Sequence, residues 1–281
     1  MRTDCGSAFT RVRTLMLPFF LFISQTLFAD NNVSGALFDH VLNGTKLDIF
    51  PFLPEITLPF GMTVHQFMLI LSAFLIILMY ALFSKRETFK PRKLQLGLEA
   101  LVLYVRDEIV YPIMGKDKGK KWIPFFTSLF IFLITVNLLG LIPAFKTATG
   151  NINVTGALAL IILILTFVVG FKEIGFSRFF KNLYPEGTAR PIGLFVAFLE
   201  FLSIFTKSMV LALRLFANMF AGHLAILSFL VLLFIISPFF GFIAVPFALF
   251  TYVLEVLIGL LQALVFTLLS CIFISMASSS H

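Results

Sequence analysis

Charged side chains are rare in the C-terminal third of the chain, and those present are of types that can act on ions in a membrane. Between Pro191 and the C-terminus, the only Asp, Glu, Lys or Arg residues are Glu200, Lys207, Arg214 and Glu255. Placing a charge at the centre of a bilayer costs at least about 2.5–3.5 kcal/mol, so such residues usually face a protein interior or a water-filled cavity. We therefore expect functional residues in this region.

Helical spacing gathers these side chains onto two polar faces. The first face carries residues spaced by 7, 7 and 4 positions: Glu200, Lys207, Arg214 and Asn218. At roughly 100° per residue they fall within about 40° of one another. On the helix that follows, Glu255 and Gln262 are again 7 positions apart and share a face.

An antiparallel hairpin would bring the two faces together. Facing residues of such a hairpin have nearly constant sums of residue numbers. The sums for Arg214 with Gln262 and for His223 with Glu255 differ by only two. One register therefore predicts both pairs, with arginine and glutamine at mid-depth and histidine and glutamate nearer the outer tip.

The residue types suggest ion transfer along two separate aqueous paths. Arginine keeps its proton in proteins, so Arg214 is a permanent charge that blocks a continuous proton wire and attracts a carboxylate. Histidine and glutamate side chains can bind and release protons. We expect an outer path that ends at His223 and Glu255 and an inner path that begins near Glu200, with Arg214 between them.

Each residue also has a structural interpretation. Arg214 would tie helices together through carbonyl groups, and His223 with Glu255 would form a neutral hydrogen-bonded pair. Asn218 would pack and hydrogen-bond without conducting. For Lys207 we favour snorkelling toward the cytoplasmic interface over a role in transport.

Composition requires a membrane environment for the elements that carry these residues. Of the 281 residues, 59% are hydrophobic and 12% are charged, whereas a soluble domain carries roughly 25% charged residues. The net charge of +7 comes from bases that lie between apolar segments, which is typical of the positive-inside bias and not of nucleic-acid binding. The two cysteines and four histidines are dispersed, so we expect no metal, cofactor or catalytic residue.

The hydropathy pattern predicts an all-α membrane protein of about five membrane helices. A helix of about 20 residues crosses an apolar core of about 30 Å. The predicted spans are residues 64–83, 122–145 and 152–171, followed by a hairpin of 192–236 and 239–277. Each hairpin arm is nearly twice the length of an upright span, so we expect it to be steeply tilted or to bend within the membrane, with a turn at Ser237–Pro238.

Residues 84–121 separate the first two spans and hold ten Lys/Arg and five Asp/Glu. Apolar residues recur there at helical spacing: Leu94, Leu98, Leu101, Val102, Val105, Ile109 and Ile113. This pattern predicts an amphipathic helix at the membrane surface.

The N-terminal region and the basic residues predict the topology. Residues 1–29 have the order of a secretory signal peptide with cleavage after Ala29, an uncleaved hydrophobic segment being the alternative. Residues 30–63 would then be an exported segment, and residues 64–281 the membrane domain. Of the 18 Lys/Arg after residue 29, 14 fall in 84–121 and 172–190. These loops are therefore predicted to be cytoplasmic, with the N-terminus outside and the C-terminus cytoplasmic.

Several motifs together identify a family. Residues 211–223, LALRLFANMFAGH, resemble the signature around the essential arginine of the a subunit of F-type ATP synthases. Residues 255–266, the ending SMAS of 275–278, LLGLIP of 138–143 and NVT of 153–155 are also similar to that family. The resemblance covers roughly residues 35–281. The order of His223 and Glu255 is reversed in many bacterial members, and Gly150–Asn151 replaces a common Ala-Asp.

The resemblance implies a stationary, non-catalytic, proton-translocating subunit with two offset half-channels in a bacterial inner (plasma) membrane. Its implied partners are the rotating c-ring, b-type peripheral stalk subunits and the lipid bilayer. Arg214 would face the c-ring carboxylates beside Gln262 and Asn218. Glu200 would line the cytoplasmic half-channel, and His223 with Glu255 the outer one. The coupling ion, proton or sodium, is left open because its ligands would lie mainly on the c-ring.

Two other classes predict different sequence features. A secondary ion-coupled transporter would show repeated halves and broken helices around a central site, and no repeat is visible. An intramembrane enzyme would need a nucleophile or a metal set, and none is suitably spaced.

Overall fold

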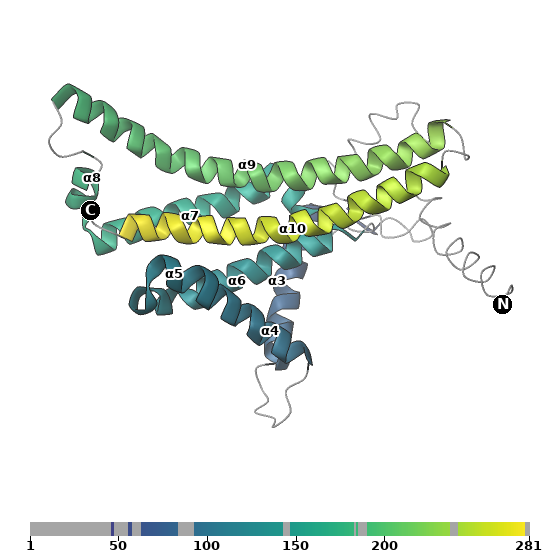
Figure 1. Ribbon diagram of the computed structural model, residues 1–281, viewed down its shortest axis with the longest axis horizontal. Helices are drawn as coiled ribbons and strands as arrows, with labels where there is room; N and C mark the ends of the chain where they lie inside the picture. Colours follow the sequence, from purple (N-terminus) through teal and green to yellow (C-terminus); the bar gives the residue numbers. More distant parts are fainter. Residues whose placement is uncertain are drawn as a thin grey trace.

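The computed structural model (Figure 1) describes residues 46–47, 56–57, 63–83, 93–142, 147–182, 184, 190–236 and 241–278. These residues include most of each predicted membrane span. The predicted signal peptide, most of the exported segment and the hairpin turn at Ser237–Pro238 lie outside them.

The described part of the chain is an all-α membrane fold, as the hydropathy pattern predicts. The helices long and apolar enough to cross a membrane are α3 (Val64–Phe83), α6 (Lys116–Gly140), α7 (Ile152–Glu173), α9 (Arg190–Ile236) and α10 (Gly241–Ser278). The shorter elements are β1 (Lys46–Leu47), β2 (Ile56–Thr57), α4 (Lys93–Tyr104), η2 (Val105–Val110), α5 (Tyr111–Met114), η3 (Ala148–Gly150) and α8 (Phe176–Asn182). β1 and β2 form a small antiparallel pair.

Helix α6 is shifted from the predicted span of 122–145. It begins at Lys116, directly after Gly115, whose φ of 75° favours glycine. Lysine side chains in the first turns stay hydrated while the backbone hydrogen bonds continue, so the helix extends beyond the apolar segment. The helix ends at Gly140, where the N–H groups of Leu141 and Ile142 donate to carbonyls three residues back.

From Lys93 on, where the structure describes it, the predicted amphipathic segment is helical but not uniformly so. Between α4 and α5, residues Val105–Val110 take π-helical geometry. A π-turn accommodates an extra residue, which rotates the following side chains. As a result Val105, Ile109 and Val110 are all buried, and the segment packs against the main core through them.

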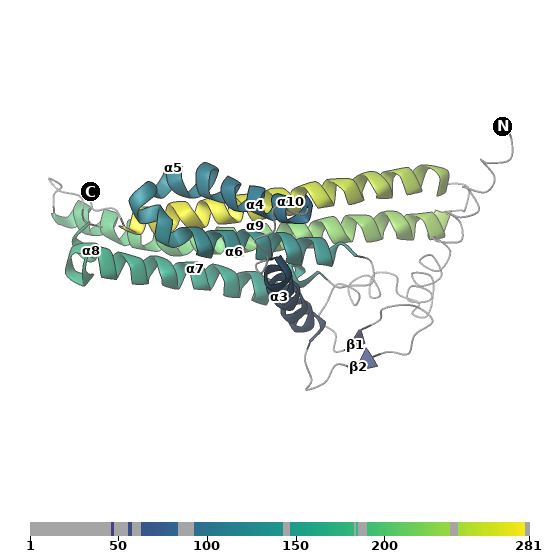
Figure 2. The same cartoon turned by 90° about the horizontal axis from the view of Figure 1, so that it is seen from below.

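The hairpin of α9 and α10 runs along the long axis of the molecule beside α6 and α7, whereas α3 crosses this direction (Figures 1 and 2). The apolar parts of the two hairpin helices cover 36 and 34 residues. At 1.5 Å per residue they are about 50–55 Å long, and fitting them into an apolar core of about 30 Å requires an inclination of roughly 55°. The steep tilt expected from sequence is therefore a consequence of length.

One apolar cluster joins η2, α6, α7, α9 and α10. Its largest fully buried members come from five elements: Ile109, Phe126, Leu133, Ile162, Leu211, Leu215, Phe266 and Ile274. A second cluster packs Val64 and Met68 of α3 against Val136 of α6. The hairpin is thus held on a scaffold of α6 and α7, with α3 attached to α6.

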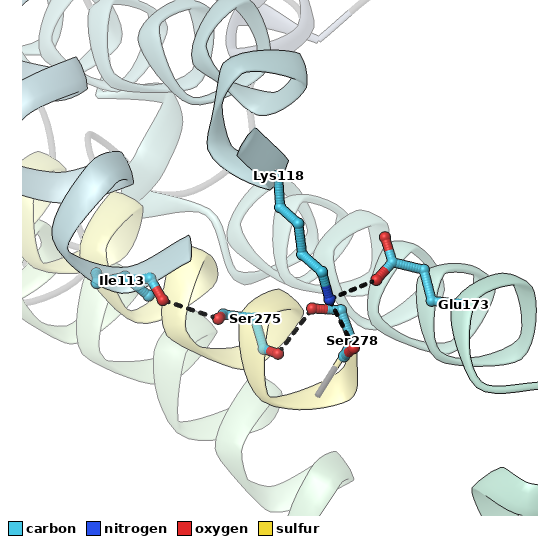
Figure 3. Close-up of polar contacts among 5 residues, drawn as sticks. All are labelled: Ile113, Lys118, Glu173, Ser275 and Ser278. Atoms are coloured by element: carbon cyan, nitrogen blue, oxygen red, sulfur yellow. Dashed lines mark hydrogen bonds and ion pairs between the residues drawn. The ribbon is translucent and has the colours of Figure 1, made fainter. Parts of the chain in front are cut away.

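Polar contacts hold the C-terminal end of α10 (Figure 3). Lys118 Nζ lies 3.3 Å from Glu173 Oε2 and 3.3 Å from the backbone oxygen of Ser278. Ser275 Oγ donates to the Ile113 carbonyl at 3.1 Å. These contacts connect α10 to α5, α6 and α7. A cation at a helix C-terminus is also favoured by the helix dipole.

Helix α8 was not expected from the sequence, which indicated only a basic loop at 172–190. Helix α7 ends before Gly175, whose φ of 90° permits a sharp turn into α8. Phe179 of α8 is buried against Gly170 of α7, where a Cβ would stand 2.7 Å from the ring. The contact between Phe179 and Gly170 therefore stabilises α8. The helix is too short for its apolar residues to show a helical period in the sequence.

Candidate functional site

The structure brings His223 and Glu255 together across the hairpin. His223 Nδ1 lies 3.7 Å from Glu255 Oε1, with 18% and 2% of the two side chains exposed. Within the described part of the chain, neither carboxylate oxygen accepts a hydrogen bond. The histidine and the carboxyl group therefore face each other across the hairpin at a distance longer than a hydrogen bond.

Gly222 makes the close approach of the two helices possible. A Cβ at this position would stand 3.0 Å from Cγ, Cδ and Oε1 of Glu255. Such spacing is tighter than ordinary van der Waals contact. The glycine of α9 therefore forms one wall of the space that holds the carboxyl group of Glu255.

Gln262 pairs with Asn218 in the structure. Asn218 Nδ2 donates to Gln262 Oε1 at 3.0 Å, and the Gln262 side chain is buried. The sequence register had placed Gln262 opposite Arg214, one helical turn away on the same face of α9. Asn218 is thus the direct partner, and Arg214 lies next to this amide pair along the helix.

Arg214 lies on the uncovered side of α9. Its neighbours Leu211 and Leu215 are buried in the core, whereas Val210 and Leu213 are exposed like the arginine itself. Among the described residues, no hydrogen bond or ion pair to Arg214 is present. Only 11% of the residues in the membrane-spanning part of α9 are buried within the structure, against 44% of those in α6 and in α10. The helix that carries the arginine is therefore the least covered of the described membrane helices.

Glu200 is separated from the other candidates along α9. It is exposed, 14 residues before Arg214, or about 21 Å along the helix axis. An aromatic cluster supports this part of α9, since the Phe167 ring of α7 lies 6.3 Å from Phe201 and 5.8 Å from Phe205. Lys207, between Glu200 and Arg214, is half-buried.

Sequence reasoning did not single out a buried polar group of α6. Asn137 is completely buried; its Nδ2 donates to the Gly259 carbonyl at 2.9 Å, and its Oδ1 accepts from Thr149 Oγ1 at 3.0 Å. A signal was present, because an asparagine in the middle of an apolar span is itself unusual. Asparagine is not ionisable, so it is not part of the pattern of charged residues that marks α9 and α10.

The arrangement has three levels along the hairpin. His223 pairs with the buried Glu255, Arg214 lies nine residues before His223 on the open side of α9, and Glu200 lies farther along. Nine residues correspond to about 13.5 Å of helix. Arg214 therefore lies between Glu200 and the His223–Glu255 pair along α9, and no described side chain forms an ion pair with it.

Comparison with known proteins gives a consistent result. Residues 66–275 match the family described as ATP synthase A chain. ATP synthase subunit a of Myxococcus xanthus (strain DK1622) is 37% identical over 231 residues, covering 81% of this chain and 76% of the relative. ATP synthase subunit a of Chlorobium phaeobacteroides (strain DSM 266 / SMG 266 / 2430) is 34% identical over 265 residues, covering 89% and 77%.

A third relative extends the match over nearly the whole chain. ATP synthase subunit a 2 of Prosthecochloris aestuarii (strain DSM 271 / SK 413) is 32% identical over 308 aligned positions, covering 98% of this chain and 94% of the relative. The motif around Arg214, the five apolar helices and the extent of these matches agree. This chain therefore belongs to the ATP synthase A chain family, the multi-pass membrane a subunits of ATP synthase.

Proposed function

We propose that this chain is the stationary proton-translocating subunit of an F-type ATP synthase and that it offers two offset half-channels to a rotating c-ring. The observation that carries the proposal is the position of Arg214. A guanidinium that cannot lose its proton lies in an apolar helix, on the open face of α9, without a neutralising partner in the described residues. Such a charge in a membrane is stabilised by an anionic partner or by water, and we propose that a carboxylate of another subunit is that partner.

A carboxylate carried past Arg214 by a neighbouring rotor would supply that partner. The open face of α9 around Arg214 is apolar, with Val210 and Leu213 exposed beside it. A neutral carboxyl group can move along an apolar surface, and an ionised one is attracted to the guanidinium. Arg214 would therefore admit only the ionised form to the site and keep the two aqueous paths apart.

The outer path would end at His223 and Glu255, and the inner path would begin at Glu200. A proton entering from outside would pass through the buried pair to a c-ring carboxylate. After nearly a full rotation, that group would release its proton toward Glu200. A membrane potential supplies about 2.3 kcal/mol per charge per 100 mV, which biases the direction of rotation.

Orientation and partners are part of the same proposal. The basic loops 84–121 and 172–190 would face the cytoplasm of a bacterium, with the N-terminus outside and the C-terminus inside. The c-ring would cover α9, and b-type peripheral stalk subunits would hold the chain against rotation. ATP chemistry would take place on other subunits.

The test is Arg214→Ala in the assembled complex, followed by ATP-driven proton uptake and passive proton leak in inverted membrane vesicles. We expect coupled pumping to be abolished and passive leak to rise, because the barrier between the two paths is lost. Lys207→Ala is the matched control. It removes a cation seven residues before Arg214 on the same face of the helix, and we expect this variant to keep pumping.

Retained coupled pumping by Arg214→Ala would remove the central role given to this residue. Solute accumulation by the purified chain in vesicles without a c-ring would favour a secondary transporter instead. Copurification with a ring of small subunits, measured in the same preparation, separates a failure of assembly from a failure of transport.

A further inference from the structure

We infer that Asn137 is a positioning residue that fixes α10 in rotation and register against α6 and α9, an inference that rests on the function proposed above. Its side chain is completely buried, and both ends of its amide are used. The Nδ2 group donates to a backbone carbonyl of α10, so this contact does not depend on any α10 side chain. A hydrogen bond from a neighbouring helix to a backbone carbonyl forms only when the accepting helix has the right rotation and register.

The carbonyl that Asn137 binds lies between the two functional pairs. Gly259 comes four residues after Glu255 and three residues before Gln262, so all three lie on one side of α10. A Cβ at Gly259 would stand 3.5 Å from Cβ of Asn137 and 4.0 Å from Sδ of Met219. Side chains of α6 and α9 therefore meet the backbone of α10 at this glycine, which lies between Glu255 and Gln262 in the sequence.

The turn between α6 and α7 sets the direction of the Asn137 amide. Thr149 in η3 is buried and donates its hydroxyl to Oδ1 of Asn137. Thr147 in the same turn donates to the Gly140 carbonyl at 2.9 Å, and a Cβ on Gly140 would stand 2.9 Å from Cα of Thr147. Since Oδ1 is occupied by Thr149, the amide NH₂ must point toward Gly259.

Loss of this contact has a specific geometric consequence. Each residue of a helix is rotated about 100° from the last, so a small rotation of α10 moves Glu255 out of reach of His223. The space for the Glu255 carboxyl is narrow, as Gly222 shows. We therefore expect the removal of Asn137 to disturb the outer pair at a distance, without any contact between Asn137 and that pair.

Disulfide cross-linking in the whole complex tests the register directly. With Cys5 and Cys271 replaced by serine, Gly222→Cys with Glu255→Cys reports the native register, because a Cβ at 222 stands 3.0 Å from Cγ of the native glutamate. Gly222→Cys with Val256→Cys reports a rotated α10. We expect Asn137→Leu to lower the first cross-link about threefold, which matches the loss of one average interhelical hydrogen bond, and to raise the second.

Paired variants separate the two hydrogen bonds of Asn137. Asn137→Ala removes both hydrogen bonds without adding a larger side chain, so it should shift the cross-links like Asn137→Leu. Thr149→Val should shift them in the same direction, and Thr149→Ser should restore the native pattern. Thr135→Val is the matched control, because Thr135 bonds only within α6, to the Ile131 carbonyl at 2.8 Å.

Transport is measured separately, with Glu255 and Gly222 intact. Asn137→Leu should lower ATP-driven proton pumping while the amount of a subunit and c-ring in the membrane is unchanged. Unaltered cross-linking in both Asn137→Leu and Asn137→Ala would overturn the inference, whatever the pumping rate. Coupled pumping by Arg214→Ala would overturn the proposed function instead, and would leave the cross-linking result in place.

Discussion

Gly222→Ala should slow proton transport because it crowds the carboxyl group of Glu255. The added Cβ would stand 3.0 Å from three atoms of the Glu255 side chain, which is itself 2% exposed and has little room to move. Crowding of a well-packed site typically costs about 1–3 kcal/mol. If the transport step bears this cost, the rate falls about 5- to 150-fold. Gly222→Val should be slower still.

The assay is ATP-driven proton uptake by inverted vesicles, normalised to the amount of assembled complex. Gly156→Ala is the control, because a Cβ at Gly156 of α7 has no neighbour within 4 Å. The effect should also depend on Glu255: in a Glu255→Gln background, Gly222→Ala should cause little further loss, since both changes act on one group. Wild-type transport by Gly222→Ala, or a fully additive loss in the double variant, would refute this reasoning.

Two further predictions concern the buried pair and the interfacial segment. Glu255→Gln should slow proton pumping with assembly intact, because the amide cannot carry a proton to or from His223; unchanged flux would reduce the pair to a structural contact. Outside the membrane spans, the hydrogen bond from Arg106 holds the pKa of Asp107 below its usual value. This contact stabilises the fold above the usual aspartate pKa and is lost as pH falls through the lowered one. Arg106→Gln should therefore raise the pKa of Asp107 in an NMR titration, and an unchanged value would contradict the assignment.

Much of the fold can be predicted from the sequence because hydropathy and helical period are local properties. The stretch of about 20 apolar residues at 64–83 coincides with α3 (Val64–Phe83), and the length of the hairpin arms requires their tilt. The pairing of His223 with Glu255 was also predictable. The register is the one unknown of an antiparallel hairpin, and the polar positions on the two helices indicate which register to expect.

Tertiary packing determined the features that hydropathy and helical period do not specify, such as the partner of Gln262 and the π-turn at Val105–Val110. Register fixes how far two helices slide, but their rotation about their own axes depends on contacts with a third helix. Gln262 bonds to Asn218, one turn of α9 after Arg214, and the α10 backbone nearby is held by Asn137 of α6 through the Gly259 carbonyl. The π-turn at Val105–Val110 is likewise set by burial against the core. The sequence by itself determined the long membrane helices, the polar residues that they carry and the pairing of His223 with Glu255. Only the three-dimensional structure decided the short helix α8 and the pairing of Gln262 with Asn218, because these depend on packing between segments that lie far apart in the chain.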